Sequence, residues 1–299
     1  MPAMTTALDK NYKVDAAFMK LHAQWLLDNG CTGIIALGSL GQGATLTFEE
    51  KEAILRNLVA TSAGRTPVVA AISALSTDEA VSLAKSAEQA GCSGLMVLPP
   101  YVYKGEWREM KAHVSAIIRA TPLPCMLYNN PVAYGTDFIP EQIAELAVEH
   151  MNLEAVKESS TDVRRVTGIR ALLGGRLKLF VGVDDAIVEA IAAGAVGWVA
   201  GLVNAFPAES VALFDYASAG KSEEAFALYR WFLPLLRMDT TPDFVQLIHL
   251  VQQEVGAGSA RVRAPRLEPA GATLDEARKV VKHALANRPS VRSTPFPKG

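Results

Sequence analysis

The chain has few of the residues that hold metals or form disulfides. Three cysteines and five histidines occur among its 299 residues. Cys31, Cys92 and Cys125 lie in or beside apolar stretches, with no CxxC pair and no metal-ligand spacing, so we expect buried structural thiols. The histidines form no HxxxH pair and have no carboxylate pattern beside them, so the sequence predicts no metal site.

The chain also lacks an excess of charge of one sign and any long hydrophobic run. Lys and Arg total 29 and Asp and Glu total 31, which gives a formal net charge of -2 and no dense basic stretch. This balance predicts no nucleic-acid partner. No apolar run approaches the roughly 20 residues that a membrane helix needs, and the N-terminus lacks the pattern of a signal peptide. We therefore expect a cytoplasmic protein with no membrane partner.

Short apolar runs separated by amphipathic segments dominate the first two thirds of the chain. Because the runs are continuously apolar and alternate with helical segments, they predict a parallel sheet with helices on its faces. The seven predicted strands are 32–38, 67–73, 93–100, 124–130, 153–159, 177–184 and 194–201. The clearest predicted helices between them are 47–62, 77–90, 106–120, 140–149 and 185–193.

The number of strand and helix units favours a closed (β/α)₈ barrel over an open doubly wound sheet. An open dinucleotide-binding sheet should carry GxGxxG directly after its first strand, whereas the glycine pattern here, "GSLGQG", follows what would be the second. The first strand of the barrel would be the segment 1–6, "MPAMTT". Because this segment is shorter than the others, we expect it to close the barrel poorly.

The alternation of strands and helices stops after Gly220. Three further helices are predicted within 221–238, 242–256 and 273–289, and a connector that contains Pro and Arg, 258–269, joins the last two. The sequence therefore predicts a barrel that carries the active site over 1–220 and a helical C-terminal extension over 221–299.

In a (β/α)₈ barrel the active site lies at the carboxyl ends of the strands, so candidate residues can be chosen by position. Those at or just past the predicted strand ends are Gly38, Ser39, Ser73, Pro99, Tyr101, Tyr128, Lys157, Asp184 and Asn204. We expect Lys157 and Tyr128 to be catalytic, and Gly38, Ser39, Tyr101, Asp184 and Asn204 to bind substrate.

Lys157 and Tyr128 end neighbouring predicted strands and form the reactive pair. Burial in the mouth of a barrel disfavours the ammonium form of a lysine and leaves a free amine that can attack a carbonyl, as in Schiff-base enzymes. The phenol of Tyr128 could then move protons to and from the amine. The alternatives are a structural salt bridge from Lys157 to Glu158 or Asp184, and a tyrosine that only packs at the barrel rim.

The glycine-containing loop after the first long strand suits a carboxylate. Gly38, Gly41 and Gly43 let backbone approach a ligand, and Ser39 adds a hydroxyl beside backbone N–H groups. Thr47 and Glu50 have the spacing of a capping box, so we expect them to start the next helix rather than to bind substrate.

Three motifs in this order resemble the dihydrodipicolinate synthase and N-acetylneuraminate lyase family: "GSLGQGATLTFEEKEAIL" at 38–55, "YNNP" at 128–131 and "VKESS" at 156–160. The resemblance implies a (β/α)₈ barrel with a C-terminal helical extension, usually a homotetramer, and no metal or organic cofactor. It implies that Lys157 forms an imine with a 2-oxo acid such as pyruvate and that Tyr128 transfers protons. It also implies that Ser39 and the Leu40 amide hold the carboxylate of the substrate.

Departures from the family pattern bear on the substrate. Lysine-biosynthetic synthases have an arginine where this chain has Ala133, and a second tyrosine, donated across a dimer interface, where it has Val102. Tyr103 is the nearest possible substitute for this second tyrosine, but in an extended segment its side chain would point to the side opposite that of residue 102. In the glycine loop, the family usually has a residue with a hydroxyl where this chain has Leu40, and a glutamate where it has Gln42.

The resemblance and these departures lead to a specific prediction with open alternatives. We predict a lyase that acts on a 2-oxo acid or its cyclic imine, most specifically a 1-pyrroline-4-hydroxy-2-carboxylate deaminase of hydroxyproline breakdown. The alternatives are a 4-hydroxy-tetrahydrodipicolinate synthase-like enzyme and a 2-keto-3-deoxy sugar acid aldolase or dehydratase. A further alternative, of a different class, is a non-catalytic protein that binds 2-oxo acids.

Overall fold

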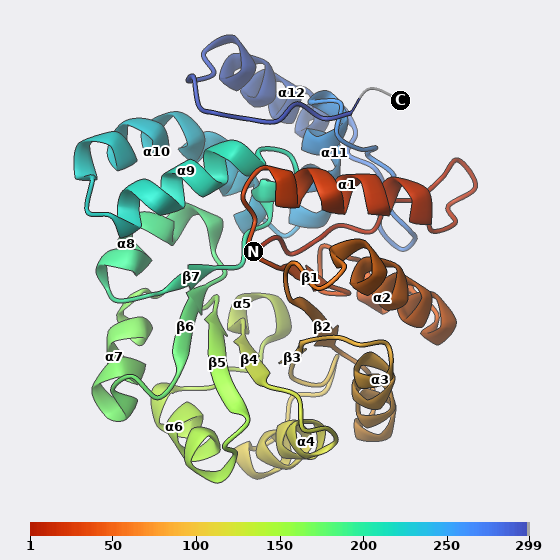
Figure 1. Ribbon diagram of the computed structural model, residues 1–299, viewed down its shortest axis with the longest axis vertical. Coiled ribbons are helices and arrows are strands. Elements are labelled where there is room, and N and C mark those ends of the chain that lie inside the picture. Colours follow the sequence, from red (N-terminus) through yellow and green to blue (C-terminus); the bar gives the residue numbers. More distant parts are fainter. Residues whose placement is uncertain (298–299) are drawn as a thin grey trace.

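Seven parallel strands form a curled sheet at the centre of the molecule, and helices surround it (Figure 1). The computed structural model describes residues 1–297. Each strand pairs with the next along the chain, which gives a TIM-barrel-like α/β fold. The strands are β1 (Ile34–Ala36), β2 (Val68–Ile72), β3 (Gly94–Val97), β4 (Cys125–Asn129), β5 (Leu153–Glu158), β6 (Lys178–Val181) and β7 (Gly197–Trp198). Nearly all of their residues are buried, as expected for a parallel sheet covered on both faces.

The N-terminal segment lies between the two edges of this sheet. The N–H of Ala3 donates to the carbonyl of Ala200 just after β7 (2.8 Å), and the N–H of Met4 donates to the carbonyl of Ile35 in β1 (2.8 Å). Residues 1–6 thus take the place predicted for the first strand, although they form isolated bridges rather than a regular strand. Hydrogen bonds tie the segment to both edges of the sheet, while the way it closes the barrel stays a prediction.

Helices follow the strands in chain order. They are α1 (Ala16–Asp28), η1 (Gly43–Thr45), α2 (Phe48–Ser62), α3 (Thr77–Gln89), α4 (Trp107–Arg119), α5 (Pro131–Tyr134), α6 (Pro140–Glu149), α7 (Arg164–Leu173), η2 (Asp184–Ala186), α8 (Ile187–Ala192), η3 (Leu202–Asn204) and α9 (Pro207–Ser218). The predicted capping box is confirmed, since the Thr47 hydroxyl accepts the Glu50 N–H and the Glu50 carboxylate accepts the Thr47 N–H. The seven predicted strands and five predicted helices are confirmed to within three residues at each end.

The three predicted C-terminal helices are confirmed as α10 (Ser222–Leu236), α11 (Phe244–Glu254) and α12 (Gly271–Ala286), with η4 (Arg237–Thr240) between the first two. Helix α10 packs on α8 and α9, and α12 packs on α10 and α11 (Figure 1). The short η4 contacts η2, and so carries part of the C-terminal region toward the strand ends. The domain boundary after Gly220 stays a prediction.

The three cysteines are free and buried, as predicted. Burial raises the pKa of Cys31 to about 11 and those of Cys92 and Cys125 to about 12. Their thiols therefore stay protonated at neutral pH and act as packing groups.

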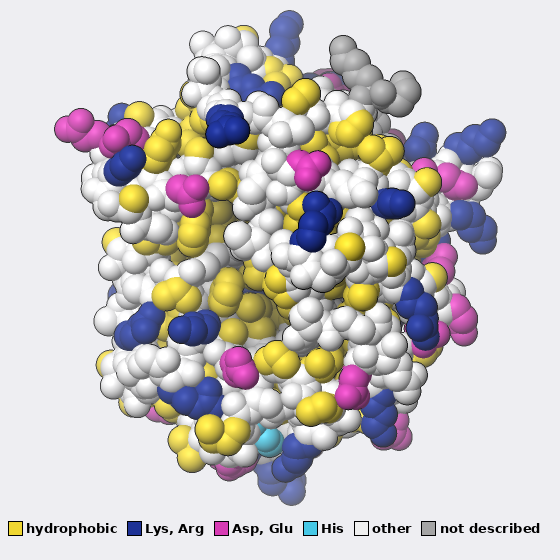
Figure 2. Space-filling view, viewed as in Figure 1, with side chains coloured by type: hydrophobic (Ala, Val, Ile, Leu, Met, Phe, Trp, Pro, Cys, Tyr) yellow, Lys and Arg dark blue, Asp and Glu magenta, His cyan; other side chains and the backbone are white. Residues whose placement is uncertain are grey.

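The molecular surface carries charges of both signs. In the space-filling view, Lys and Arg side chains are interspersed with Asp and Glu, and hydrophobic side chains gather in a hollow near the middle of the face (Figure 2). Within residues 1–297 no helix is long and apolar enough to cross a membrane.

Candidate active site

A cavity of about 420 Å³ lies at the carboxyl ends of the strands. Six of the predicted site residues line it: Gly38, Ser39, Leu40, Tyr101, Tyr128 and Lys157. The C-terminal region covers part of the same cavity, through η4 and the connector before α12. The position of the cavity is the one expected of an active site in this class of fold.

Lys157 lies inside the sheet with its side chain aimed into the cavity. It pairs with Tyr128 in the register of β4 and β5, and it is only 5% exposed. Its Nζ lies 4.2 Å from the centroid of the Tyr128 ring, within the range of a cation–π contact. Among residues 1–297 no carboxylate lies within 4.0 Å of this amine, so the alternative salt bridge to Glu158 or Asp184 is not formed.

Tyr128 meets the amine with its ring face, while its hydroxyl has a different neighbour. The amide Nδ2 of Asn130 donates to the Tyr128 hydroxyl at 2.9 Å. The expected proximity of Tyr128 to Lys157 is therefore present, but the amine contacts the ring rather than the phenol oxygen. A substrate bound to Nζ would have to lie between the amine and the hydroxyl for the phenol to transfer protons.

The glycine loop presents a hydroxyl and free backbone donors to the cavity. In the described part of the chain, the N–H groups of Ser39 and Leu40 have no acceptor within the protein. Gly43 is needed for the loop itself, because a Cβ there would lie 2.1 Å from the carbonyl oxygen of Leu37. Two unpaired N–H groups beside a hydroxyl form a small anion-binding concavity.

Tyr134 is a cavity residue that the sequence did not single out. Its hydroxyl is hydrogen-bonded to the Ser39 hydroxyl, and its ring centroid lies 5.7 Å from that of Tyr128 and 5.8 Å from that of Tyr101. Burial raises the pKa of both Tyr101 and Tyr134, so these phenols stay protonated at neutral pH. Residue 134 thus places a second hydroxyl between the loop and the catalytic candidates.

The local sequence explains how Tyr134 reaches this place. The side chain of Asn130 accepts the N–H of Ala133 and caps α5, Pro131 occupies its first turn, and Gly135 ends it at a φ of 69°. The signal was visible in "NNPVAYG" as a one-turn helix that ends on a tyrosine.

The segment around Val102 and Tyr103 is not extended, in contrast to the expectation from the sequence. Val102 has a left-handed φ of 69°, and the N–H of Tyr103 donates to the carbonyl of Tyr101. The chain therefore turns at Val102. Tyr103 is half exposed and does not line the cavity.

Two residues predicted to bind substrate, Asp184 and Asn204, are not part of the cavity lining, and their binding role stays a prediction. Asp184 is fully buried and accepts the N–H groups of Trp198 Nε1, Gly201 and Leu202. Asn204 is also fully buried and hydrogen-bonds the backbone of residues 3, 5 and 201. Their side chains serve the junction between the N-terminal segment and the end of β7, because every strand end also needs groups that satisfy its backbone.

Among the polar residues that line the cavity without having been predicted as site residues are Ser159, Asp239 and Arg266. Ser159 Oγ and Asp239 Oδ1 are shut off from solvent and have no hydrogen-bond partner within the described residues. Arg266 forms no ion pair there. Ser159 was visible next to the "VKE" motif, whereas Asp239 and Arg266 reach the cavity only through the packing of the C-terminal region.

The described residues contain no group of three or more His, Cys, Asp or Glu side chains close enough together to hold a metal ion. The polar groups of the cavity include the amine of Lys157, phenols, hydroxyls, backbone N–H groups, the guanidinium of Arg266 and the carboxyl group of Asp239. A TIM-barrel-like fold with a lysine beside a tyrosine in its cavity is the arrangement of imine-forming lyases of the class I aldolase type.

The chain belongs to the dihydrodipicolinate synthetase family, whose model matches residues 1–284. Members of this family are lyases of the class I aldolase type, and the chain is an enzyme of that class.

Curated relatives and solved structures share both sequence and fold with the chain. It is 32% identical over 275 residues to the 4-hydroxy-tetrahydrodipicolinate synthase of Geotalea uraniireducens, covering 91% of each protein. It is 30% identical over 269 residues to the 4-hydroxy-tetrahydrodipicolinate synthase of Methanococcus maripaludis, covering 90% of this chain and 92% of the relative. A crystal structure of dihydrodipicolinate synthase from Bacillus anthracis has a TM-score of 0.90 at 28% identity and covers 97% of both chains.

Proposed function

We propose that the protein is a Schiff-base-forming lyase in which Lys157 attacks the C2 carbon of a 2-oxo acid or of its cyclic imine. The observation that carries this proposal is a buried lysine that lines the cavity and, among residues 1–297, has no carboxylate within 4.0 Å of its amine. A lysine amine buried in this way can act as a nucleophile, because no ion pair holds it in its charged form.

The neighbouring groups have roles that suit this chemistry. The hydroxyl of Ser39 and the N–H groups of Ser39 and Leu40 would hold the substrate carboxylate, because they form an unpaired donor set at one side of the cavity. Tyr128 would protonate the oxygen or nitrogen that leaves C2, and would take a proton back when the enamine forms. Tyr134 would relay protons between Tyr128 and Ser39.

Two candidate reactions share the imine and differ in the step after it. The curated relatives support a condensation of the synthase type, which was the alternative in the sequence-based prediction. In that case Arg266 would bind the carboxylate of a second substrate in place of the arginine that Ala133 replaces, since its guanidinium lines the cavity and forms no ion pair within residues 1–297. The specific deaminase prediction has no such support from the relatives, and it rests on Ala133 and Val102.

Borohydride trapping tests the proposed role of Lys157. Incubation with pyruvate and borohydride should add the mass of a reduced pyruvate imine to Lys157, and Lys157→Ala should remove both the adduct and turnover. Tyr128→Phe should form the same adduct more slowly and turn over about 100-fold or more slowly, because the amine is kept and only proton transfer is lost. An unmodified Lys157 in the wild-type protein would contradict the proposal.

A substrate panel separates the candidate reactions. It contains pyruvate with aspartate semialdehyde, 1-pyrroline-4-hydroxy-2-carboxylate, 2-keto-3-deoxygluconate and N-acetylneuraminate. Condensation on the first pair supports the synthase reaction, whereas ammonia release from the second supports the deaminase. Tight binding of 2-oxo acids with no turnover of any member would support a non-catalytic protein.

We further propose that residues 1–6 take the place of the eighth strand of a (β/α)₈ barrel. We also propose that the protein is a homotetramer, as the family resemblance implies. The bridges from Ala3 and Met4 to both sheet edges support the first part. Light scattering coupled to size-exclusion chromatography tests the second, and a monomer mass would contradict it.

A further inference from the structure

One carboxyl group in the cavity has no role in imine formation. Asp239 lies in η4 of the C-terminal region and lines the cavity together with Lys157. The residue as a whole is half-buried, but its Oδ1 is shut off from solvent and has no hydrogen-bond partner. A buried acceptor without a partner destabilises the folded protein, so its retention beside a nucleophilic lysine points to a use.

Close packing holds this carboxyl group in place. It lies against the backbone at Gly201, where a Cβ would come within 2.1 Å of Oδ1 and 2.6 Å of Cγ. Because Gly201 follows β7, this contact places the carboxyl group of Asp239 over the strand ends, although Asp239 itself belongs to the C-terminal region. Only a residue without a side chain at 201 leaves room for it.

The hydrogen bonds around two neighbouring carboxyl groups decide which of them carries a charge. Asp184 accepts three N–H donors, from Trp198, Gly201 and Leu202, which stabilise its carboxylate form. Within residues 1–297 no donor reaches Asp239 Oδ1, so Asp239 is the one of the two that keeps a proton. Burial, and after it the charge of Asp184, raise the pKa of Asp239 well above its usual range, while Lys157 acts in the opposite direction and Asp185 in the same one.

We propose that Asp239 is the general acid that protonates a hydroxyl group leaving from C4 of the substrate, counting the carboxylate carbon as C1. The inference rests on the proposed imine chemistry of Lys157 and deepens it, because it names the substrate class. The substrate is a 2-oxo acid, or the cyclic imine of one, with a hydroxyl at C4, and the reaction after imine formation is an elimination.

The step balances with the groups in the cavity. Loss of a proton from C3 of the Lys157 imine to Tyr128 gives an enamine with a C2=C3 double bond. The enamine nitrogen then re-forms the C2=N bond, the C2=C3 electron pair moves to C3=C4, and the C4–O bond breaks with its pair on oxygen. That oxygen takes the proton of Asp239 and leaves as water, and the resulting carboxylate is reprotonated from solvent before the next turnover.

Asp239→Asn tests this role with three reactions, which differ in whether a leaving group departs and whether that group must be protonated. Exchange of the C3 protons of pyruvate with deuterium reports the imine and the enamine and needs no leaving group. Elimination from 4-chloro-2-oxobutanoate releases chloride, which needs no proton. Elimination from 1-pyrroline-4-hydroxy-2-carboxylate or 2-keto-3-deoxygluconate needs a proton on the departing oxygen.

The variant should keep pyruvate exchange and chloride release at the wild-type rate, and should lose about 100-fold or more on the hydroxyl substrates. Gly201→Ala, which must displace the carboxyl group, should show the same selective loss. Asp243→Asn is the matched control, since Asp243 precedes α11 in the same segment and lies outside the cavity lining, and the amide oxygen of asparagine can still accept the hydroxyl of Thr241. It should retain wild-type rates with all probes.

An equal loss on all three probes in Asp239→Asn would overturn the proposal, because it would show a structural effect on the imine steps. So would wild-type rates on the hydroxyl substrates, or a wild-type enzyme that exchanges pyruvate protons but eliminates from neither of them. Failure of the proposed function itself looks different, since the wild-type protein would then neither form the borohydride adduct nor exchange pyruvate protons.

Discussion

Gly182 lies against the side chain of Lys157, directly after β6. A Cβ at this position would be 2.3 Å from Lys157 Cε and 2.1 Å from Ser159 Oγ, both closer than any normal contact. The backbone there is not in the left-handed region, so the residue is glycine for space rather than for conformation. The orientation of the nucleophile thus depends on a residue that carries no chemistry itself.

Gly182→Ala should therefore displace Lys157 while the fold is kept. We expect activity to fall about 100-fold, since a misplacement of about 1 Å at a reacting atom has an effect of this size. Gly175→Ala is the control, because a Cβ there meets nothing within 4 Å. Initial rates and borohydride trapping measure the effect, and a fully active Gly182→Ala variant would show that Lys157 has more freedom than the packing indicates.

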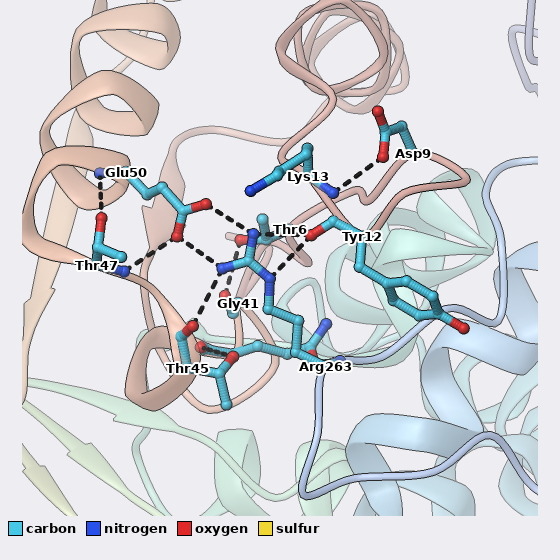
Figure 3. Close-up of polar contacts among 10 residues, drawn as sticks. Thr6, Asp9, Tyr12, Lys13, Gly41, Thr45, Thr47, Glu50 and Arg263 are labelled. Atoms are coloured by element: carbon cyan, nitrogen blue, oxygen red, sulfur yellow. Dashed lines mark hydrogen bonds and ion pairs between the residues drawn. The ribbon is translucent and has the colours of Figure 1, made fainter.

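At the scale of elements, Arg263 joins the C-terminal connector to the start of α2 and to the segment before α1 (Figure 3). Its guanidinium donates to both carboxylate oxygens of Glu50, at 2.6 and 2.7 Å, and to the carbonyls of Tyr12 and Thr45. Its backbone N–H donates to the side chain of Gln42 at 2.8 Å. One residue thus fixes the far end of the glycine loop.

Arg263→Lys should lower the free energy of unfolding by about 1–3 kcal/mol, because an ammonium cannot reach the carboxylate and both carbonyls at once. Urea unfolding measures the change. Arg164→Lys is the control: its pair with Asp162 is exposed, so we expect no change in the unfolding midpoint. Equal behaviour of the two variants would mean that the Arg263 contacts add nothing beyond a surface pair.

At the scale of the whole molecule, two buried histidines make the stability depend on pH. His22 in α1 contacts the carbonyl of Asn204 at 2.9 Å, and His249 lies in α11 near Gln42. Burial lowers the pKa of each to about 4 from an ordinary value of 6.5. Their contribution is present above pH 6.5 and is lost as the pH falls toward 4, because the unfolded chain takes up protons first. Asp184, whose pKa is raised to about 6, acts in the opposite direction over part of this range.

His22→Gln isolates one of these contributions, since the amide can still donate to the Asn204 carbonyl. Between pH 7 and pH 4.5 the wild-type protein should lose about 3 kcal/mol more of its free energy of unfolding than this variant, from a difference of about two pH units between 6.5 and 4.5 at 1.36 kcal/mol each. Urea titrations at both pH values provide the measurement. His283→Gln, on the exposed side of α12, should keep the wild-type pH dependence. Identical slopes for the wild type and His22→Gln would refute the assignment.

Local sequence patterns were enough to predict the order of strands and helices, the strand ends and the lysine–tyrosine pair. These features depend on local periodicity and on the rule that parallel strands end at one edge, so Lys157 and Tyr128 could be named in advance. The same rule also named Asp184 and Asn204, whose side chains bond groups near the end of β7 and the N-terminal segment. The rule cannot tell a side chain that faces a substrate from one that satisfies backbone groups, so the substrate-binding role of these two residues stays a prediction.

The closure of the barrel and the set of distant residues that share the cavity came from tertiary packing alone. Residues 1–6 look too short for a strand, yet they gain hydrogen bonds from both edges once the sheet curls. Asp239 and Arg266 enter the site from a 3₁₀ turn and a connector. The connector is held by contacts between segments far apart in the chain, such as that of Arg263 with Gln42, 221 residues apart, and no local pattern in a sequence encodes such contacts.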